Sequence, residues 1–409
     1  MSQTKTVGCL FMVAGTTLGA GMLALPLVAS GSGFFVSAIA LCCLWALMAY
    51  TALLILEVNI HFPIGSSFGT MAQETLGVFG KTITFAAMIL LFYALTAAYI
   101  SGGSTLFTEV SRAYFHFNIP VSLSAFVFTV LFGGVIYWKT QAVDYVNRIL
   151  FSIKISALIL SISAMLTHVH RNLLFDAAHH PVYILAAIPI MFTSFGFHGS
   201  IPSILKYLGH DAKRLRFVFV VGSLIPLVIY LFWVLVTVGV LPLTGAQSFS
   251  QILKSNGSVG LFTVELSHAL HSHYLALAIN LFSNIAVTTS FLGVGLGLFD
   301  YFYDNLKKNN VGKRELSAVI TFLPPLLFAW FYPNGFIVAL GFAAIALAIL
   351  AVLLPASMVW SWRSRESSRN QDIAYRVFGG KPLIAVVFMI GIIIILLQLL
   401  EMCHLLPQI

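Results

Sequence analysis

Apolar residues run along the chain in long stretches that are separated by charged residues, by Pro/Gly turns or by clusters of polar residues. A helix that crosses the hydrocarbon core of a bilayer needs about 20 mostly apolar residues. Eleven stretches are of this size, so the sequence predicts an all-α membrane protein with eleven transmembrane helices. Their approximate bounds are 7–29, 34–59, 82–108, 121–138, 149–168, 181–207, 216–241, 273–302, 315–332, 335–360 and 381–401.

Two of these predicted helices are interrupted near their middles by residues that form helix poorly. Helix one carries GTTLGAG at 15–21, and helix six carries TSFGFHG at 193–199. The breaks are five helices apart, and because five is odd, a repeat of five helices would be inverted relative to its copy. Inverted repeats with broken helices are typical of secondary transporters that bind substrate at the middle of the membrane. The expected repeats are 1–170 and 181–360, with an extra helix at 381–401.

The composition supports one membrane domain over residues 1–409. Hydrophobic residues make up 59% of the chain and charged residues only 8%, against about a quarter charged in a soluble domain. The mean hydropathy of +0.98 is spread along the whole length, so a lipid bilayer surrounds most of the protein. Disordered, collagen-like and disulfide-scaffold proteins are excluded. The four cysteines form no C-x-x-C pair, which argues against a disulfide framework or a zinc knuckle.

The distribution of charge predicts the topology. Lys and Arg outnumber Asp and Glu by 21 to 13, which alone would suit a nucleic-acid partner. With the N-terminus in the cytoplasm, however, the cytoplasmic segments hold 17 of these cations and the outer segments hold three. Basic residues are retained on the cytoplasmic side of membranes. The excess therefore indicates a cytoplasmic N-terminus and an outer C-terminus, and no nucleic-acid partner is expected.

The two breaks are candidate substrate sites, because an opened helix exposes backbone groups that lipid cannot satisfy. The N–H groups at Gly19, Ala20 and Gly21 would begin a half-helix, where a carboxylate is favoured. The carbonyl groups freed at 193–195 suit an ammonium group, so together the breaks describe a receptor for a zwitterion. The alternative is that the glycines only allow close helix packing. The candidate binding residues at the breaks are Gly15, Thr16, Thr17, Gly19, Ala20, Gly21, Thr193, Ser194, Phe195, Gly196, Phe197 and His198.

The walls of such a pocket would come from polar or aromatic residues in neighbouring helices. We expect Tyr93, Thr96 and Ala97 of helix three and Asn284 of helix eight to contact the substrate. Residues of this kind also hold membrane helices together by hydrogen bonds. His198 similarly has two interpretations, since it could touch the substrate or a gate, or it could hydrogen-bond the loosened backbone.

Lys154 is the one cation placed well inside a predicted span. It lies six residues into helix five, a depth of about 9 Å at 1.5 Å per residue. An ionisable group at this depth is costly and functional by default, so Lys154 is a candidate to exchange a proton during transport. The alternative is that its long side chain reaches the cytoplasmic interface. Glu57, Asp300 and Asp304 lie near the cytoplasmic ends of their helices, where solvated or gate-forming roles are expected.

Neither a cofactor nor a metal is expected. The chain has no G-x-x-x-x-G-K-[ST] motif and no catalytic constellation, so we predict a protein that is not an enzyme and that draws energy from an ion or substrate gradient. Seven histidines gather on or near the outer side, but without cysteines or carboxylates at suitable spacing they do not indicate a metal site. They are His168, His170, His179, His180, His268, His271 and His273.

Several longer runs are similar to the bacterial hydroxy and aromatic amino acid permease family. They are GTTLGAGMLALP at 15–26, FTSFGFHGSIPS at 192–203, TSFLGVGLGLFDY at 289–301, LWALMAYTALLILEV at 44–58, YALTAAYISGG at 93–103 and ITFLPPL at 320–326. The resemblance runs nearly from end to end.

The resemblance implies a proton symporter of the bacterial inner membrane with a leucine-transporter-like fold, a cytoplasmic N-terminus and a periplasmic C-terminus. Its implied substrate is an aromatic amino acid, L-tyrosine first, with tryptophan or broad aromatic transport as the alternative. In relatives within the wider superfamily a lysine of helix five takes the place of a sodium ion, and Lys154 falls at that position. A channel or sensor without coupled transport is the alternative of a different class. The sequence predicts no oligomeric state.

Overall fold

The computed structural model describes residues 2–138, 140–176, 180–308, 314–366 and 375–407, and it is helical throughout, with no strand in these ranges. Ten helices are long and apolar enough to cross a membrane, or up to eleven spans if the bent pair at the N-terminus counts as one. The predicted all-α membrane class and the span count are therefore confirmed. The outer His179 lies outside the described residues.

The helices follow one another with short connections. They are α1 (Ser2–Thr17), α2 (Ala24–Ala29), α3 (Gly33–Asn59), α4 (Phe68–Phe115), α5 (Val121–Trp138), α6 (Thr140–Met165), α7 (Arg171–Leu174), α8 (Ile184–Thr193), α9 (Ile201–Leu208), α10 (Ala212–Val240), α11 (Phe249–Lys254), α12 (Val259–Ala269), α13 (His273–Lys308), α14 (Arg314–Phe331), α15 (Phe336–Ala348), α16 (Leu354–Glu366) and α17 (Lys381–Met402). Short 3-10 helices lie between some of them, namely η1 (Ala20–Leu23), η2 (Leu166–His168), η3 (Pro181–Tyr183) and η4 (His198–Ser200), and the π-helix η5 (Ile349–Leu353) joins α15 to α16.

The predicted bounds were too short for the third span. The sequence places this helix at 82–108, whereas α4 runs from Phe68 to Phe115. It starts earlier because the Ser67 side chain accepts a hydrogen bond from the Thr70 N–H at 3.1 Å and caps the helix. Gly77, with φ of 75°, then bends the first turns away from the rest. The predicted start therefore lies just beyond this bend.

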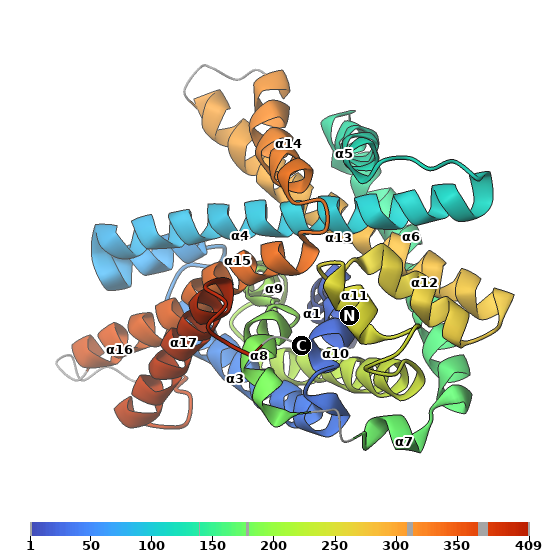
Figure 1. Cartoon of the computed structure of the whole chain (residues 1–409). Coiled ribbons are helices and arrows are strands. Elements are labelled where there is room, and N and C mark those ends of the chain that lie inside the picture. Colours follow the sequence, from blue (N-terminus) through green and yellow to red (C-terminus); the bar gives the residue numbers. More distant parts are fainter. Residues whose placement is uncertain (1, 139, 177–179, 309–313, 367–374, 408–409) are drawn as a thin grey trace.

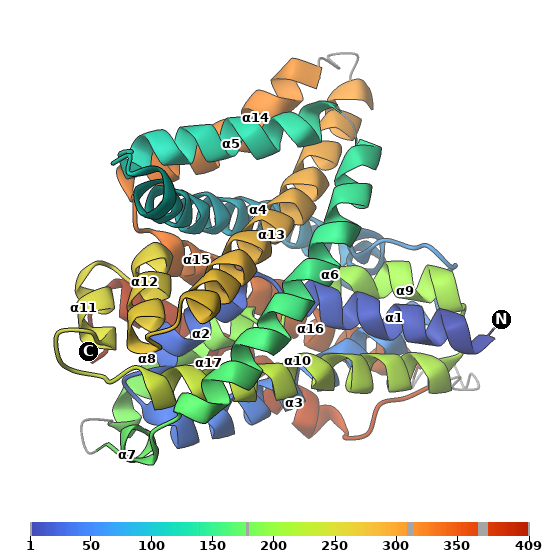
Figure 2. The same ribbon diagram turned by 90° about the vertical axis from the view of Figure 1, so that its right-hand side faces the viewer.

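The helices form two groups of neighbours, shown in Figures 1 and 2. In one group α13 packs along α6 and α4, and α4 also packs on α15 and α5. In the other group α10 packs on α1 and α3. Contacts between α2 and α8 bring the first and sixth spans together, and α13 contacts the first span at η1. The short helices α7, α11 and α12, which the sequence did not predict, lie toward the end of the molecule that carries the C-terminus (Figure 2), called the C-terminal face below.

Glu57 is not solvated, although the sequence left that role open. Its carboxylate forms a two-pronged ion pair with Arg363 of α16, at 2.6 and 2.7 Å, and both side chains are at most 2% exposed. The same carboxylate accepts a hydrogen bond from the Val377 N–H at 2.7 Å. The pair therefore ties α3, α16 and the segment before α17 together inside the protein. Asp304, in contrast, is exposed, and Asp300 is partly buried.

Candidate functional site

Both breaks predicted from the sequence are present. The first span bends by 48° between α1 and η1, because helical hydrogen bonding stops at Thr17 and Gly19 takes an extended conformation. In the sixth span α8 ends at Thr193, and a turn of four residues precedes η4 and α9. A Cβ atom on Gly21 would lie 3.4 Å from the Ser194 hydroxyl oxygen. The two breaks therefore lie against each other.

Tyr230 of α10 joins the two breaks. Its hydroxyl oxygen lies 2.6 Å from the carbonyl oxygen of Thr17 and 2.8 Å from that of Ser194. The side chain is fully buried, and its ring packs edge-on against Phe195 with the centroids 5.4 Å apart. The hydroxyl has one proton to donate, which the two carbonyl oxygens share or exchange. The sequence analysis missed Tyr230, because a single tyrosine within an apolar span carries no signal of its direction.

Lys154 of α6 reaches the first break from another side. Its ammonium group donates a hydrogen bond to the carbonyl oxygen of Leu18 at 2.8 Å and lies 3.5 Å from the Thr289 hydroxyl oxygen. The residue is only 3% exposed, so its side chain does not extend to the membrane surface. Within the described ranges it forms no ion pair. Its charge is therefore stabilised by hydrogen-bonding dipoles and by the Phe151 ring, whose centroid lies 4.9 Å from the nitrogen, and any loss of its proton changes how firmly α6 holds the first break.

Ser290 of α13 caps the second half of the first span. Its hydroxyl oxygen accepts a hydrogen bond from the Ala20 N–H at 2.9 Å, and the Tyr99 hydroxyl interacts with the same group. A Cβ atom on Gly19 would lie 3.1 Å from this oxygen. An N–H donor that starts a half-helix is thus paired with a side chain that a carboxylate could replace.

The remaining residues of the breaks have mixed roles. Phe195 and Phe197 are fully buried or nearly so. The Nε2 of His198 lies 2.8 Å from the Thr51 hydroxyl oxygen on α3. Gly15 packs under the Phe151 ring, since a Cβ atom there would lie 3.2 Å from it, and Gly196 packs near Leu347 in the same way. The hydroxyls of Thr16, Thr17 and Thr193 bond carbonyl groups of their own helices.

The hydrogen bonds and cavities that involve the predicted wall residues do not include residues of the breaks. The Tyr93 hydroxyl donates a hydrogen bond to the Ile320 carbonyl of α14 at 2.7 Å, and Thr96 bonds the Phe92 carbonyl of its own helix. Ala97 lines a cavity on the Tyr93 side of α4, and Asn284 lines a separate, smaller one. Tyr99, six residues after Tyr93, points about 240° further around the helix, and its hydroxyl interacts with Ser290, which caps the first break.

The site is thus a closed polar cluster in an apolar surrounding. Four side chains from four other helices form it: three contact backbone groups of the breaks directly, and Tyr99 contacts one of these three, Ser290. They are Tyr99, Lys154, Tyr230 and Ser290; Ser290 is the least buried of them. No three His, Cys, Asp or Glu side chains of the described ranges gather closely enough to hold a metal ion. The groups of this cluster can exchange hydrogen-bond partners, and the Lys154 ammonium group has a proton that it can release.

Comparisons with known proteins show the family of this chain. The profile of the tryptophan/tyrosine permease family matches residues 2–398. The chain is 41% identical to tyrosine-specific transport system 1 of Haemophilus influenzae, over 96% of both chains. It is 36% identical to the tryptophan-specific transport protein of Shigella flexneri, over 99% of this chain and 97% of the other. It is 33% identical to the low affinity tryptophan permease of Escherichia coli, over 97% and 96%. The chain is a multi-pass membrane transport protein, not an enzyme, and it belongs to the tryptophan/tyrosine permease family.

Proposed function

We propose that the protein is a proton-coupled symporter that imports L-tyrosine across the bacterial inner membrane by alternating access. The observation that carries the proposal is the contact between Lys154 and the carbonyl of the first break, next to the second break. The tyrosine-specific relative at 41% identity favours tyrosine, and the tryptophan-specific relative at 36% makes tryptophan the close alternative. The excess of Lys and Arg in alternate segments favours a cytoplasmic N-terminus and a periplasmic C-terminus.

The substrate would exchange partners with side chains of the cluster. Its ammonium group would take the carbonyl oxygens of Thr17 and Ser194 that Tyr230 now holds. Its carboxylate would take the N–H of Ala20 from Ser290. Both exchanges replace neutral hydrogen bonds with charge-assisted ones, which are about twice as strong. The buried ring of Phe195, which follows Ser194 and packs against Tyr230, supports an aromatic substrate, and the Phe197 ring packs further on against His198 and Phe219.

The proton would act through Lys154. In its charged form the side chain holds the Leu18 carbonyl by a charge-assisted hydrogen bond. Loss of the proton weakens this bond and loosens α6 from the first break. Residues 1–170 and 181–360 would move as two inverted repeats around the breaks, while α17 stays outside them. Proton release and substrate release would then favour the same change of access.

Uptake of labelled tyrosine by the full-length protein in lipid vesicles tests the proposal. An imposed inward proton gradient should drive accumulation, and a protonophore should abolish it. Excess tyrosine should compete better than excess tryptophan or phenylalanine. Equal competition by all three would refute tyrosine preference. Equilibration without accumulation would instead indicate a channel or sensor and refute symport.

A further inference from the structure

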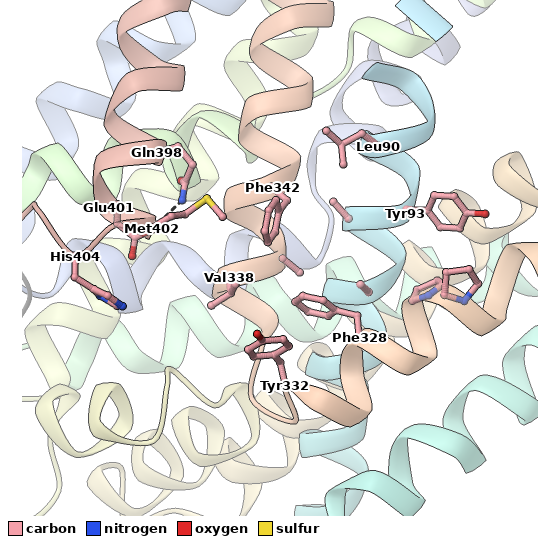
Figure 3. Close-up of a pocket in the computed structure, with 15 residues that line it drawn as sticks. Leu90, Tyr93, Phe328, Tyr332, Val338, Phe342, Gln398, Glu401, Met402 and His404 are labelled. Atoms are coloured by element: carbon pink, nitrogen blue, oxygen red, sulfur yellow. Dashed lines mark hydrogen bonds between the residues drawn. The ribbon is translucent and has the colours of Figure 1, made fainter. Parts of the chain in front are cut away.

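A second site lies apart from the two breaks, in a cavity of about 660 Å³ between α4, α14, α15 and α17. Figure 3 shows Gln398, Glu401 and His404 along one side and Phe328 and Tyr332 along another, with Phe342 between them. This cavity is independent of the transport mechanism proposed above, and α17 lies outside the predicted repeats. It therefore needs an explanation of its own.

The polar end of the cavity is built from Gln398 and Glu401 of α17 and from His404, which follows this helix. Gln398 is only 1% exposed, and its amide nitrogen donates a hydrogen bond to a Glu401 carboxylate oxygen at 2.9 Å. The amide oxygen of Gln398 has no hydrogen-bond partner within the described part of the chain. Gly341 of α15 makes room for this side chain, because a Cβ atom there would lie 2.5 Å from the amide nitrogen. A buried polar atom without a partner is unfavourable, and a bound donor would recover this loss.

The charges and hydrogen-bonding groups at this end determine which ligand headgroup can bind. The amide oxygen of Gln398 and the carboxylate of Glu401 are both acceptors, so the matching group is a positively charged donor. The lining contains neither Lys nor Arg, and His404 lies on the side of Glu401 (Figure 3), so a free amino-acid carboxylate would meet the negative charge of Glu401 at this end. A primary ammonium group, with three N–H donors, fits the polar end best.

The shape of the cavity matches a lipid. Its polar end lies at the last turn of α17, near the C-terminal face, where lipid headgroups lie. Its apolar walls extend to Leu90, Ala94 and Ala97 near the middle of α4. Leu90 and Val338 are 40% and 43% exposed, so the cavity is open sideways where acyl chains lie. A phospholipid has the same arrangement, with a polar headgroup at the interface and apolar acyl chains toward the midplane.

We propose that the cavity between α4, α14, α15 and α17 binds a phospholipid with a primary ammonium headgroup, held by Glu401 and Gln398. The acyl chain lies along α4 and α15. Phosphatidylethanolamine has this headgroup, whereas phosphatidylcholine has the same charge without N–H donors. The two lipids therefore differ only in the group that the site recognises.

The test uses the full-length protein, purified in detergent and depleted of lipid. Phosphatidylethanolamine or phosphatidylcholine with identical acyl chains is added, and bound lipid is counted by native mass spectrometry. We expect phosphatidylethanolamine to bind about tenfold more tightly, the ratio that a charge-assisted hydrogen bond provides. Glu401→Gln and Gln398→Leu should remove this preference. Glu109→Gln, which changes a carboxylate at the end of α4 outside the cavity lining, should keep it.

The outcomes are distinct even if the α17 variants do not fold, because the comparison of the two lipids needs only the wild-type protein. Equal binding of both lipids by the wild type would overturn the proposal. Displacement of the lipid by free tyrosine or tyramine would also overturn it, because the site would then take a water-soluble amine. Val338→Trp, which fills the apolar part of the cavity and leaves Glu401 in place, should reduce binding of both lipids, and unchanged binding would place the lipid elsewhere.

Discussion

Replacement of Tyr230 by phenylalanine separates two roles of this residue, because it removes the hydroxyl and keeps the ring. The ring contact with Phe195 at 5.4 Å remains. The carbonyl oxygens of Thr17 and Ser194, at 2.6 and 2.8 Å in the wild type, lose their shared donor. Buried acceptors left in this way cost about 1–3 kcal/mol. Tyr230→Phe should therefore lower the free energy of unfolding in detergent by this amount.

The same substitution should strengthen substrate binding. In the wild type the ammonium group of tyrosine must displace the Tyr230 hydroxyl, and a buried hydrogen bond contributes about 0.5–1.5 kcal/mol net. In Tyr230→Phe this cost disappears, so the affinity for tyrosine should rise by about two- to tenfold. Isothermal titration or scintillation proximity binding measures the affinity of the purified protein. Turnover should fall, because the empty site closes less readily after the substrate leaves.

Tyr50→Phe is the matched control. The Tyr50 hydroxyl donates a hydrogen bond to the Phe378 carbonyl at 2.9 Å, and this buried tyrosine lies beside the Glu57–Arg363 pair and not at the breaks. The control should lose comparable stability and keep the wild-type affinity. If Tyr230→Phe binds tyrosine no more tightly than Tyr50→Phe does, the substrate does not compete with the Tyr230 hydroxyl, and the reasoning is refuted.

Three further predictions concern other buried contacts. Lys154→Met, which keeps an unbranched side chain but removes the donor to Leu18, should abolish gradient-driven accumulation and spare some tyrosine exchange; retained accumulation would exclude the coupling role. Glu57→Gln removes the carboxylate that pairs with the buried Arg363 guanidinium and should lower the unfolding free energy by about 3–5 kcal/mol, measured by denaturation in detergent; a loss below about 1 kcal/mol, as at exposed pairs, would contradict this. Ser290→Ala removes the acceptor of the Ala20 N–H and should raise the affinity for a substrate carboxylate. The ratio of the affinity for tyrosine to the affinity for tyramine, which has no carboxylate, should therefore be higher than in the wild type; an unchanged ratio would contradict this.

The spans and the breaks could be predicted because their signals are local. A stretch of about 20 apolar residues is sufficient for a membrane helix, and Gly19, Gly21 and Gly196 mark positions where helices open. Lys154 could be singled out for the same reason, since a charge within an apolar span stands out. The short helices α11 and α12 could not, because their mixed sequences are too short to span a membrane.

The partners of the breaks could not be predicted, because they depend on helix rotation and on distant packing. The segment from Tyr93 to Tyr99 presents polar or aromatic residues on several faces of α4, and the sequence does not show which face meets the first break. Tyr230 is similarly one residue in an apolar span. Glu57 and Arg363 are 306 positions apart, so nothing local indicates that they neutralise each other.

Proton entry evoked by tyrosine tests the central claim most directly, because it reports coupling at the site itself. Vesicles containing the purified protein and a trapped pH-sensitive dye are given an inside-negative potential without a pH gradient, and tyrosine is then added outside. The account predicts that the lumen acidifies with the wild type, and that it does not with Lys154→Met although tyrosine still binds. Acidification that persists in Lys154→Met, or that is absent in the wild type while tyrosine accumulates, would contradict it.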